Sequence, residues 1–186
     1  MGALQEIANL LVQTFFQLYL LALMLRLLLQ LSRADFYNPI SQFLVKVTAP
    51  LLNPLRRIIP GVGGIDVASV VLILLTQIVA IVLLLIINDS PIPNPLILII
   101  VSVLRCLRLL LNIYFFAILA SAAVSFLAPG SYHPAILLLN QLTDPVMRPF
   151  RNVIPPLGGL DFSPMFAILA IKICEILLAN IAAFLL

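Results

Sequence analysis

The sequence predicts an all-α membrane protein with four transmembrane helices. Hydrophobic residues make up 63% of its 186 residues and charged residues 9%, against about 45–50% and about 25% in soluble domains. The mean hydropathy is +1.24, and the apolar residues gather in four runs long enough to cross a bilayer core of roughly 30 Å. This composition argues against a soluble enzyme. A net charge of only +3 also gives no reason to expect direct nucleic-acid binding.

The four apolar runs are expected to be helices. A bilayer admits only helices and closed barrels, and none of the runs shows the alternating pattern of a barrel strand. The runs cover residues 4–31, 67–87, 96–127 and 165–186. In the first run the earliest basic residue is Arg26, and no small-residue cleavage site follows. We therefore expect an uncleaved span there and not a secretory signal.

The Lys and Arg residues between the spans predict the orientation of the chain. The loop after the first span carries Arg33, Lys46, Arg56 and Arg57, and the loop after the third carries Arg148 and Arg151. The short segment 88–95 has no Lys or Arg and a single acid, Asp89. Because basic loops stay on the cytoplasmic side, we expect both long loops in the cytoplasm and both termini outside.

The chain contains a tandem repeat with an offset of 95 residues. Without any gap, this shift aligns ten identical Tyr, Thr, Pro, Gly, Arg and Asp residues between positions 37–66 and 132–161. Shared hydrophobicity does not produce matches of these residue types. We therefore divide the chain into a first repeat at 1–90, with its loop at 32–66, and a second repeat at 91–186, with its loop at 128–164. Both repeats cross the membrane in the same sense, as parallel repeats do.

Each repeated loop is expected to begin with a short amphipathic helix. Asn38 and Pro39 form a helix start. One face of the helix then carries the apolar residues Ile40, Phe43, Leu44 and Val47, and its second copy carries Ala135, Leu138, Leu139 and Leu142. Such a helix suits the membrane interface. We expect Pro50 and Pro145 to end the two helices, because the residue before a proline avoids the α conformation.

A turn and an acid follow in each loop. The Gly-Gly pairs, which are Gly63 with Gly64 and Gly158 with Gly159, predict a turn with positive φ or a close backbone approach. Asp66 and Asp161 stand where the next span begins, so we expect each to cap the free N–H groups of that helix.

Two interpretations of the loops stay open. In the first, the loop is only a device that returns the chain to the membrane. In the second, it is a docking or anion-binding face built from Arg56, Arg57, Arg148 and Arg151. Arginine is the preferred partner of phosphate, although anionic lipid headgroups alone could satisfy these side chains.

Both loops contain the pattern TxPxxxPxRxxxPxxGGxD, within DFYNPISQFLVKVTAPLLNPLRRIIPGVGGID (35–66) and HPAILLLNQLTDPVMRPFRNVIPPLGGLDFSP (133–164). In these stretches the chain resembles the YggT family of bacterial and plastid membrane proteins, as two tandem copies of the family unit. The second copy has Asn152 where the first has Arg57. The resemblance implies an integral protein of the bacterial inner membrane or the plastid. Family members are linked to osmotic tolerance and ion uptake, to cell division and nucleoid organisation, and to cytochrome maturation, and the resemblance brings no catalytic residue.

Five charges lie inside the apparent spans, namely Arg26, Arg105, Arg108, Lys172 and Glu175. We expect Arg26 to snorkel to the headgroups instead of acting as a buried functional charge.

Two interpretations of the third span stay open. If it begins near residue 96, Arg108 lies roughly 18 Å into the span, and Arg105 or Arg108 pairs with Glu175 near mid-membrane. If it begins near residue 104, both arginines lie at the outer surface.

The sequence carries no catalytic or cofactor-binding constellation. It has no Ser–His–Asp set, paired carboxylates or phosphate-binding glycine loop, and His133, Cys106 and Cys174 are given no metal or disulfide role. We therefore expect a non-enzymatic protein without cofactor or metal. The first hypothesis is a scaffold or assembly factor that acts through its loops, in envelope, cell-division or membrane-complex biogenesis. The alternative is a small transporter or channel subunit in ion or osmotic homeostasis, and a homo-oligomer fits either.

Overall fold

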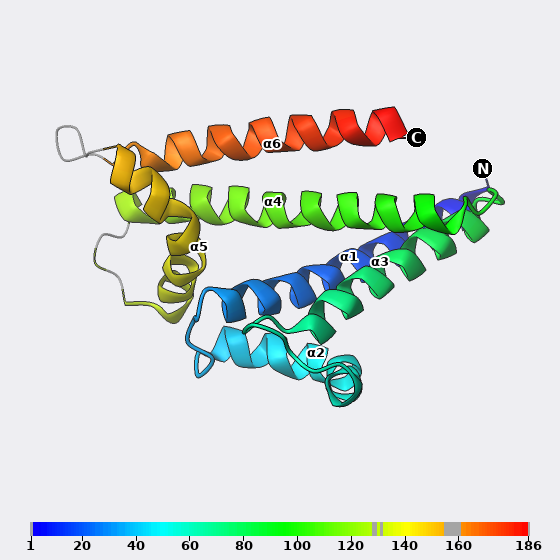
Figure 1. Ribbon diagram of the computed structural model, residues 1–186, viewed down its shortest axis with the longest axis horizontal. Helices are drawn as coiled ribbons and strands as arrows, with labels where there is room; N and C mark the ends of the chain where they lie inside the picture. The colour runs from blue at the N-terminus through cyan, green and yellow to red at the C-terminus, as the bar shows by residue number, and fades with distance from the viewer. Residues whose placement is uncertain (1, 128–129, 131, 155–160, 186) are drawn as a thin grey trace. The chain divides into compact units, whose positions relative to one another are not determined.

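A computed structural model describes residues 2–127, 130, 132–154 and 161–185 of the chain (Figure 1). These residues form six α-helices: α1 (Ala3–Leu31), α2 (Pro39–Ile58), α3 (Val67–Ile87), α4 (Pro95–Leu127), α5 (Pro134–Val153) and α6 (Ser163–Leu185). Four of them, α1, α3, α4 and α6, are long and apolar enough to cross a membrane. The predicted all-α class and the four predicted spans are confirmed.

The helices are organised in two compact units. Among the described residues, the first unit comprises those at 2–27 and 44–107, and the second comprises those at 28–43 and 108–185. Helices α1, α2 and α4 therefore each contribute residues to both units. The units follow the tandem repeat except at residues 28–43 and 91–107.

In the first unit, α1 and α3 form an antiparallel hairpin (Figure 1). Near the start of α1, Asn9 exchanges two side-chain hydrogen bonds with Asn88 at the end of α3, at 2.9 and 3.0 Å. Gln5 also donates to the carbonyl of Ile87. These amides pair polar groups that would otherwise be unsatisfied at the helix ends, so one end of the hairpin is tied by hydrogen bonds.

Two of the spans end in the same backbone motif. After α1, Arg33 has a φ of 52° and the N–H of Ala34 donates to the carbonyl of Leu29; after α3, Asp89 has a φ of 48° and Ser90 donates to Leu85. This is the Schellman arrangement, in which a left-handed residue satisfies the last free carbonyls. Arg33 and Asp89 occupy a position that usually takes glycine.

The prolines do not end the loop helices, and this corrects the sequence-based expectation for Pro50 and Pro145. Helix α2 continues through Pro50 and Pro54 to Ile58, and α5 continues through Pro145 and Pro149 to Val153. An interior proline costs about 3 kcal/mol and bends the helix, and Figure 1 draws both helices bent. Apolar side chains beyond the first proline, Leu52 in α2 and Met147 in α5, are fully buried, and each burial contributes about 1.5–3 kcal/mol toward continuing the helix past that proline.

In the second unit, α5 packs against α6 and the later part of α4. Ile118 of α4, Met147 of α5, and Ala167 and Ile171 of α6 form one buried cluster. Helix α6 runs alongside α4 in this unit (Figure 1). This packing holds α5 against α4 and α6, the two spans that it connects in the sequence. In the first repeat, α2 connects α1 and α3 in the sequence.

Candidate functional site

The first loop is closed by an ion pair between Arg56 and Asp66. Arg56 lies near the end of α2, and its Nε atom donates to Asp66 Oδ2 at 2.9 Å. Asp66 is also the N-cap residue of α3, where it accepts hydrogen bonds from the backbone N–H and the hydroxyl of Ser69. Between the two charged residues, Gly63 and Gly64 have φ values of 60° and 83°. This turn brings the end of α2 to the start of α3.

The environment of Asp66 favours its charged form. Only 7% of its surface is exposed, and burial by itself would raise the pKa of the carboxyl. The hydrogen bonds from Arg56 and Ser69 outweigh burial and hold the pKa of Asp66 below its ordinary value. The carboxylate therefore stays ionised at the N-terminus of α3, where the helix dipole also favours a negative charge.

The second loop repeats the pair at the same spacing. Arg151 Nε donates to Asp161 Oδ2 at 3.3 Å, and Asp161 accepts from the backbone N–H of Ser163 at the start of α6. Asp161 is 43% exposed. Burial opposes ionisation here too, but Ser163 and Arg151 hold the pKa of Asp161 below its ordinary value. Gly158 and Gly159 lie outside the described residues.

The second loop contains one more acid that forms ion pairs with its arginines. Asp144, which has no acidic counterpart in the first loop, lies 2.6 Å from Arg148 and 3.5 Å from Arg151. Of the four candidate docking arginines, three are thus bound to acids of their own loop. The fourth, Arg57, is exposed and makes no ion pair with any residue that the structure describes.

The pairing of these arginines with the capping acids was missed by sequence analysis. Arg56 and Asp66 recur together ten residues apart as Arg151 and Asp161, and this joint recurrence was the available signal. Because the sequence does not show the turn geometry, the arginines were interpreted as docking residues and the acids as helix caps. The structure joins them in one ion pair in each loop.

Arg26 lies buried beneath the first loop. Its side chain is 5% exposed and donates from Nη1 to the hydroxyl of Thr48 in α2 at 2.6 Å. Thr48 in turn donates to the carbonyl of Leu44 at 2.6 Å. The expectation of snorkelling is therefore wrong, because an acceptor inside the protein holds the side chain. Arg26 fastens the end of α1 to α2.

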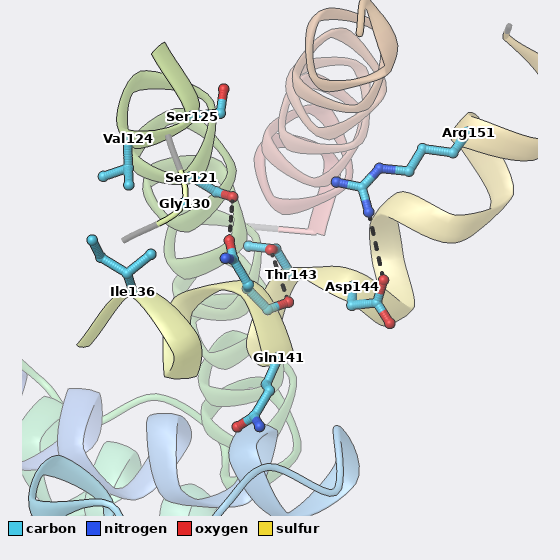
Figure 2. Close-up of a pocket in the computed structure, with 10 residues that line it drawn as sticks. Ser121, Val124, Ser125, Gly130, Ile136, Gln141, Thr143, Asp144 and Arg151 are labelled. Atoms are coloured by element: carbon cyan, nitrogen blue, oxygen red, sulfur yellow. Dashed lines mark hydrogen bonds and ion pairs between the residues drawn. The ribbon is translucent and has the colours of Figure 1, made fainter. Parts of the chain in front are cut away.

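The second repeat contains a cavity whose lining includes several polar side chains. With the offset of 95, Ser121 stands where the first repeat has Arg26. The cavity has a volume of about 660 Å³, and its lining includes Ser121, Ser125, Asn140, Thr143, Asp144 and Arg151 (Figure 2). Ser121 donates to Asn140 at 2.9 Å, so α4 and α5 are joined here by a neutral hydrogen bond and not by a buried guanidinium.

The remaining intramembrane charges are arranged differently from the predicted pairs. Helix α4 begins at Pro95, near residue 96. Arg105 and Arg108 are exposed on it. Among the described residues the ionic partner of Glu175 is Lys172 of its own helix, at 2.7 Å, and Lys172 also lies 3.9 Å above the ring of Phe115. No ion pair joins Arg108 to Glu175 in the described part of the chain.

The described residues hold no group of three or more His, Cys, Asp or Glu side chains suited to a metal ion. His133 is the N-cap residue of α5, where its Nδ1 atom accepts from the N–H of Ala135 at 3.2 Å. Cys106 is buried, Cys174 is exposed, and both are free thiols.

Comparison with known proteins identifies relatives over nearly the whole chain. The family model CCB3/YggT matches residues 5–87 and 98–182, which are two segments that follow the two repeats. An uncharacterised protein of Pseudomonas aeruginosa is 49% identical over 97% of this chain and 92% of its own length. The uncharacterised YggT protein of Escherichia coli K12 is 40% identical over 92% of this chain and 88% of its own length.

A more distant relative matches a shorter stretch of the chain. The uncharacterised ycf19 protein of Porphyra purpurea is 32% identical over 38% of this chain and 75% of its own length. No solved structure matches the chain.

Proposed function

The chain belongs to the CCB3/YggT family, and from this premise we propose that this multi-pass membrane protein is a non-enzymatic scaffold or assembly factor. Its two loop helices, α2 and α5, would bind a membrane-protein partner during envelope, cell-division or membrane-complex biogenesis. The observation that carries the proposal is the closure of both loops by an Arg–Asp ion pair at the same spacing. A loop held in this way offers a preformed surface, which lowers the entropy cost of binding.

Helix α2 has the faces that such a surface needs. One face is buried and consists of Ser41, Leu44, Thr48 and Leu52. A second face is apolar and exposed, and it consists of Ile40, Phe43, Val47 and Leu51. The buried face fixes the helix to the body of the protein. The exposed apolar face suits the boundary between headgroups and acyl chains or a partner helix lying there.

The charges of the loops indicate an acidic partner. Arg33, Lys46 and Arg57 are exposed and make no ion pairs with described residues. We place the loops on the cytoplasmic side of the bacterial cytoplasmic membrane and the termini outside, following the distribution of Lys and Arg. A partner with an acidic cytoplasmic segment next to its own span would complement both the basic residues and the apolar face.

Site-specific photo-crosslinking in native membranes tests this proposal. A photoreactive residue replaces Phe43 on the exposed face of α2, and the matched control replaces Phe15 on α1, because both rings are similarly exposed. We expect a discrete protein adduct from position 43 that is lost when Arg57→Glu is added and is absent from position 15. Lipid adducts alone at position 43, or an adduct that ignores Arg57→Glu, would refute a docking role of the loop.

A small transporter or channel subunit is the second candidate. It is favoured by the buried Arg26 and by Glu175, whose Oε1 atom is buried without a hydrogen-bond partner among the described residues, since ionisable groups inside spans often mark ion pathways. Ion flux into proteoliposomes separates this candidate from the scaffold. Transport predicts flux that falls in Arg26→Leu and Glu175→Leu but not in Phe15→Leu, and an absence of flux from the wild type excludes it.

A further inference from the structure

The cavity of the second repeat is lined by Ser121, which stands, at the offset of 95, where the first repeat has the guanidinium of Arg26. We propose that this cavity binds the guanidinium group of a small, soluble organic cation. The first repeat supplies the group from its own chain as Arg26, whereas the second has Ser121 at that position. The cavity lining carries Ser121, Thr143 and Arg151, which correspond in register to Arg26, Thr48 and Arg56.

The hydroxyl that accepts from Arg26 has a counterpart in the cavity. In both repeats the threonine is buried and donates to the carbonyl four residues earlier: Thr48 to Leu44 at 2.6 Å, and Thr143 to Leu139 at 3.0 Å. Thr48 then accepts from Arg26. Among the described residues, Thr143 bonds only to carbonyls of its own helix. Its oxygen can therefore accept a hydrogen bond from a ligand in the cavity.

Further acceptors lie around Thr143. Asp144 contributes a carboxylate whose Oδ1 atom is 3.5 Å from Arg151, a looser contact than the 2.6 Å that joins its Oδ2 atom to Arg148. Figure 2 shows Arg151 and Asp144 at one side of the cavity and Ser121 at the other. A guanidinium group, with five donors in one plane, can bond to Thr143 and to Oδ1 of Asp144.

The net charge at the lining positions is also less positive in the second repeat than at the corresponding positions of the first, as a bound cation requires. At the ten positions of the first repeat that correspond to the cavity lining, the charged residues are Arg26, Lys46, Arg56 and Asp35. At the ten lining positions themselves they are Asp144 and Arg151. Three cations and one acid become one cation and one acid. In the first repeat the buried Arg26 bonds to Thr48, about two helical turns before the ion-paired Arg56 on α2, so a cation near an ion-paired arginine has a precedent in the same fold.

The size of the cavity sets the size of the ligand. Its volume of about 660 Å³ falls within the roughly 300–1,000 Å³ of small-molecule sites. This is larger than a guanidinium group needs, so the group would enter with a short carbon chain attached. The described lining contains one apolar side chain from each helix, Val124 of α4 and Ile136 of α5, which can contact such a chain.

The test uses the full-length protein in nanodiscs of phosphatidylcholine, a lipid without a primary ammonium group. Ethylguanidinium is titrated by calorimetry at millimolar concentrations, far below those at which guanidinium salts unfold proteins. Ethylurea, its neutral planar isostere, is the matched ligand control. We expect saturable binding of ethylguanidinium and none of ethylurea. No saturable binding, or equal binding of the two, would overturn the proposal.

Two substitutions locate the site. Ser121→Arg rebuilds the first-repeat arrangement and should abolish binding by filling the cavity, whereas Gln42→Arg, an equal charge on the exposed surface of α2, should leave it unchanged. If Ser121→Arg does not fold, Asp144→Asn provides the second measurement. It should weaken binding about tenfold, because it removes one charge-assisted hydrogen bond. Binding that persists unchanged in Ser121→Arg or in Asp144→Asn would place the cation elsewhere and overturn the assignment.

The reciprocal experiment uses the first repeat. Arg26→Ser removes the built-in guanidinium and should lower the unfolding temperature, and ethylguanidinium should restore part of the loss whereas ethylurea should not. Rescue would show that this position accepts a free guanidinium. A loss in unfolding temperature that both ligands leave unchanged would count against the equivalence on which the proposal rests.

Discussion

The Nε atom of Arg56 lies 2.9 Å from Oδ2 of Asp66, and this ion pair joins the end of α2 to the start of α3 across the Gly63–Gly64 turn. The same bond, at 3.3 Å, joins Arg151 to Asp161 in the second loop. The two pairs differ in exposure, since the first carboxylate is buried and the second is 43% exposed. The difference provides an internal comparison for the contribution of the pair to stability.

Asp66→Ala should destabilise the protein more than Asp161→Ala. The first substitution removes an N-cap, which costs about 0.5–2 kcal/mol, and it also leaves Arg56 without its partner beside a buried site. We expect a total loss of about 1–3 kcal/mol for Asp66→Ala and a smaller loss of about 0.5–1 kcal/mol for Asp161→Ala, which also loses a bond to the N–H of Ser163 but whose ion pair is screened by water. Denaturant unfolding in detergent micelles measures both. Equal losses would mean that burial does not control the strength of the pair.

The lowered pKa of Asp66 predicts a loss of stability in acid. Its folded-state pKa lies below the unfolded value of about 3.9, so between these two values the unfolded state binds more protons than the folded state. Stability therefore rises with pH in that window. The contribution is fully present above about pH 5 and is lost as the pH falls through the folded-state pKa. Unfolding curves between about pH 2 and 6 should show a shallower acid dependence for Asp66→Asn than for the wild type, and parallel curves would contradict the assignment.

The features predicted from the sequence depend on composition and spacing. The four spans follow from apolar length, and the structure places them within a few residues of the predicted limits. The start of α2 at Pro39 and that of α5 at Pro134 follow from the proline at the first helical position. These are local signals, which a single sequence carries completely.

The features that were missed depend on tertiary contacts. Pro50 has a strong local tendency to end a helix, but burial of Leu52 beyond it continues α2. Arg26 has a local route to the headgroups, but Thr48, twenty-two residues away, offers an acceptor inside the protein. In each case a residue distant in sequence determines the outcome, and the local pattern does not contain that information.

Thr48→Val should destabilise the protein more than Thr143→Val. The two threonines are equivalent in the repeat, and both are buried. Only Thr48 accepts from a buried guanidinium, however, so its replacement leaves Arg26 with an unsatisfied donor, which costs about 1–3 kcal/mol. Thermal unfolding of the two variants compares them directly. A double-mutant cycle with Arg26→Met should return a coupling energy for Thr48→Val and none for Thr143→Val, and coupling to both would disprove the specific bond.

The ion pair between Lys172 and Glu175 of α6 should tolerate an exchange of its two charged residues. Lys172→Glu combined with Glu175→Lys preserves the pair of opposite charges one turn apart, so it should retain more stability than either single reversal. Arg108→Glu combined with Glu175→Arg should restore nothing, because Arg108 makes no described contact with Glu175. Phe115→Leu should cost about 0.5–2 kcal/mol through loss of the cation–π contact with Lys172. If Arg108→Glu combined with Glu175→Arg restored stability, that result would support an ion pair between α4 and α6.

Cysteine labelling tests the orientation on which the scaffold proposal depends. In a background with Cys106→Ala and Cys174→Ala, single cysteines replace Tyr37 and Tyr132 in the two loops and Ile92 between α3 and α4, because all three side chains are exposed. A membrane-impermeant maleimide should label position 92 in intact bacteria and positions 37 and 132 only after the inner membrane is opened. The physical reason is the concentration of Lys and Arg in the two loops and their absence from residues 88–95. The reverse pattern would put both loop helices outside the cytoplasm, and a partner with an acidic cytoplasmic segment could then not reach them.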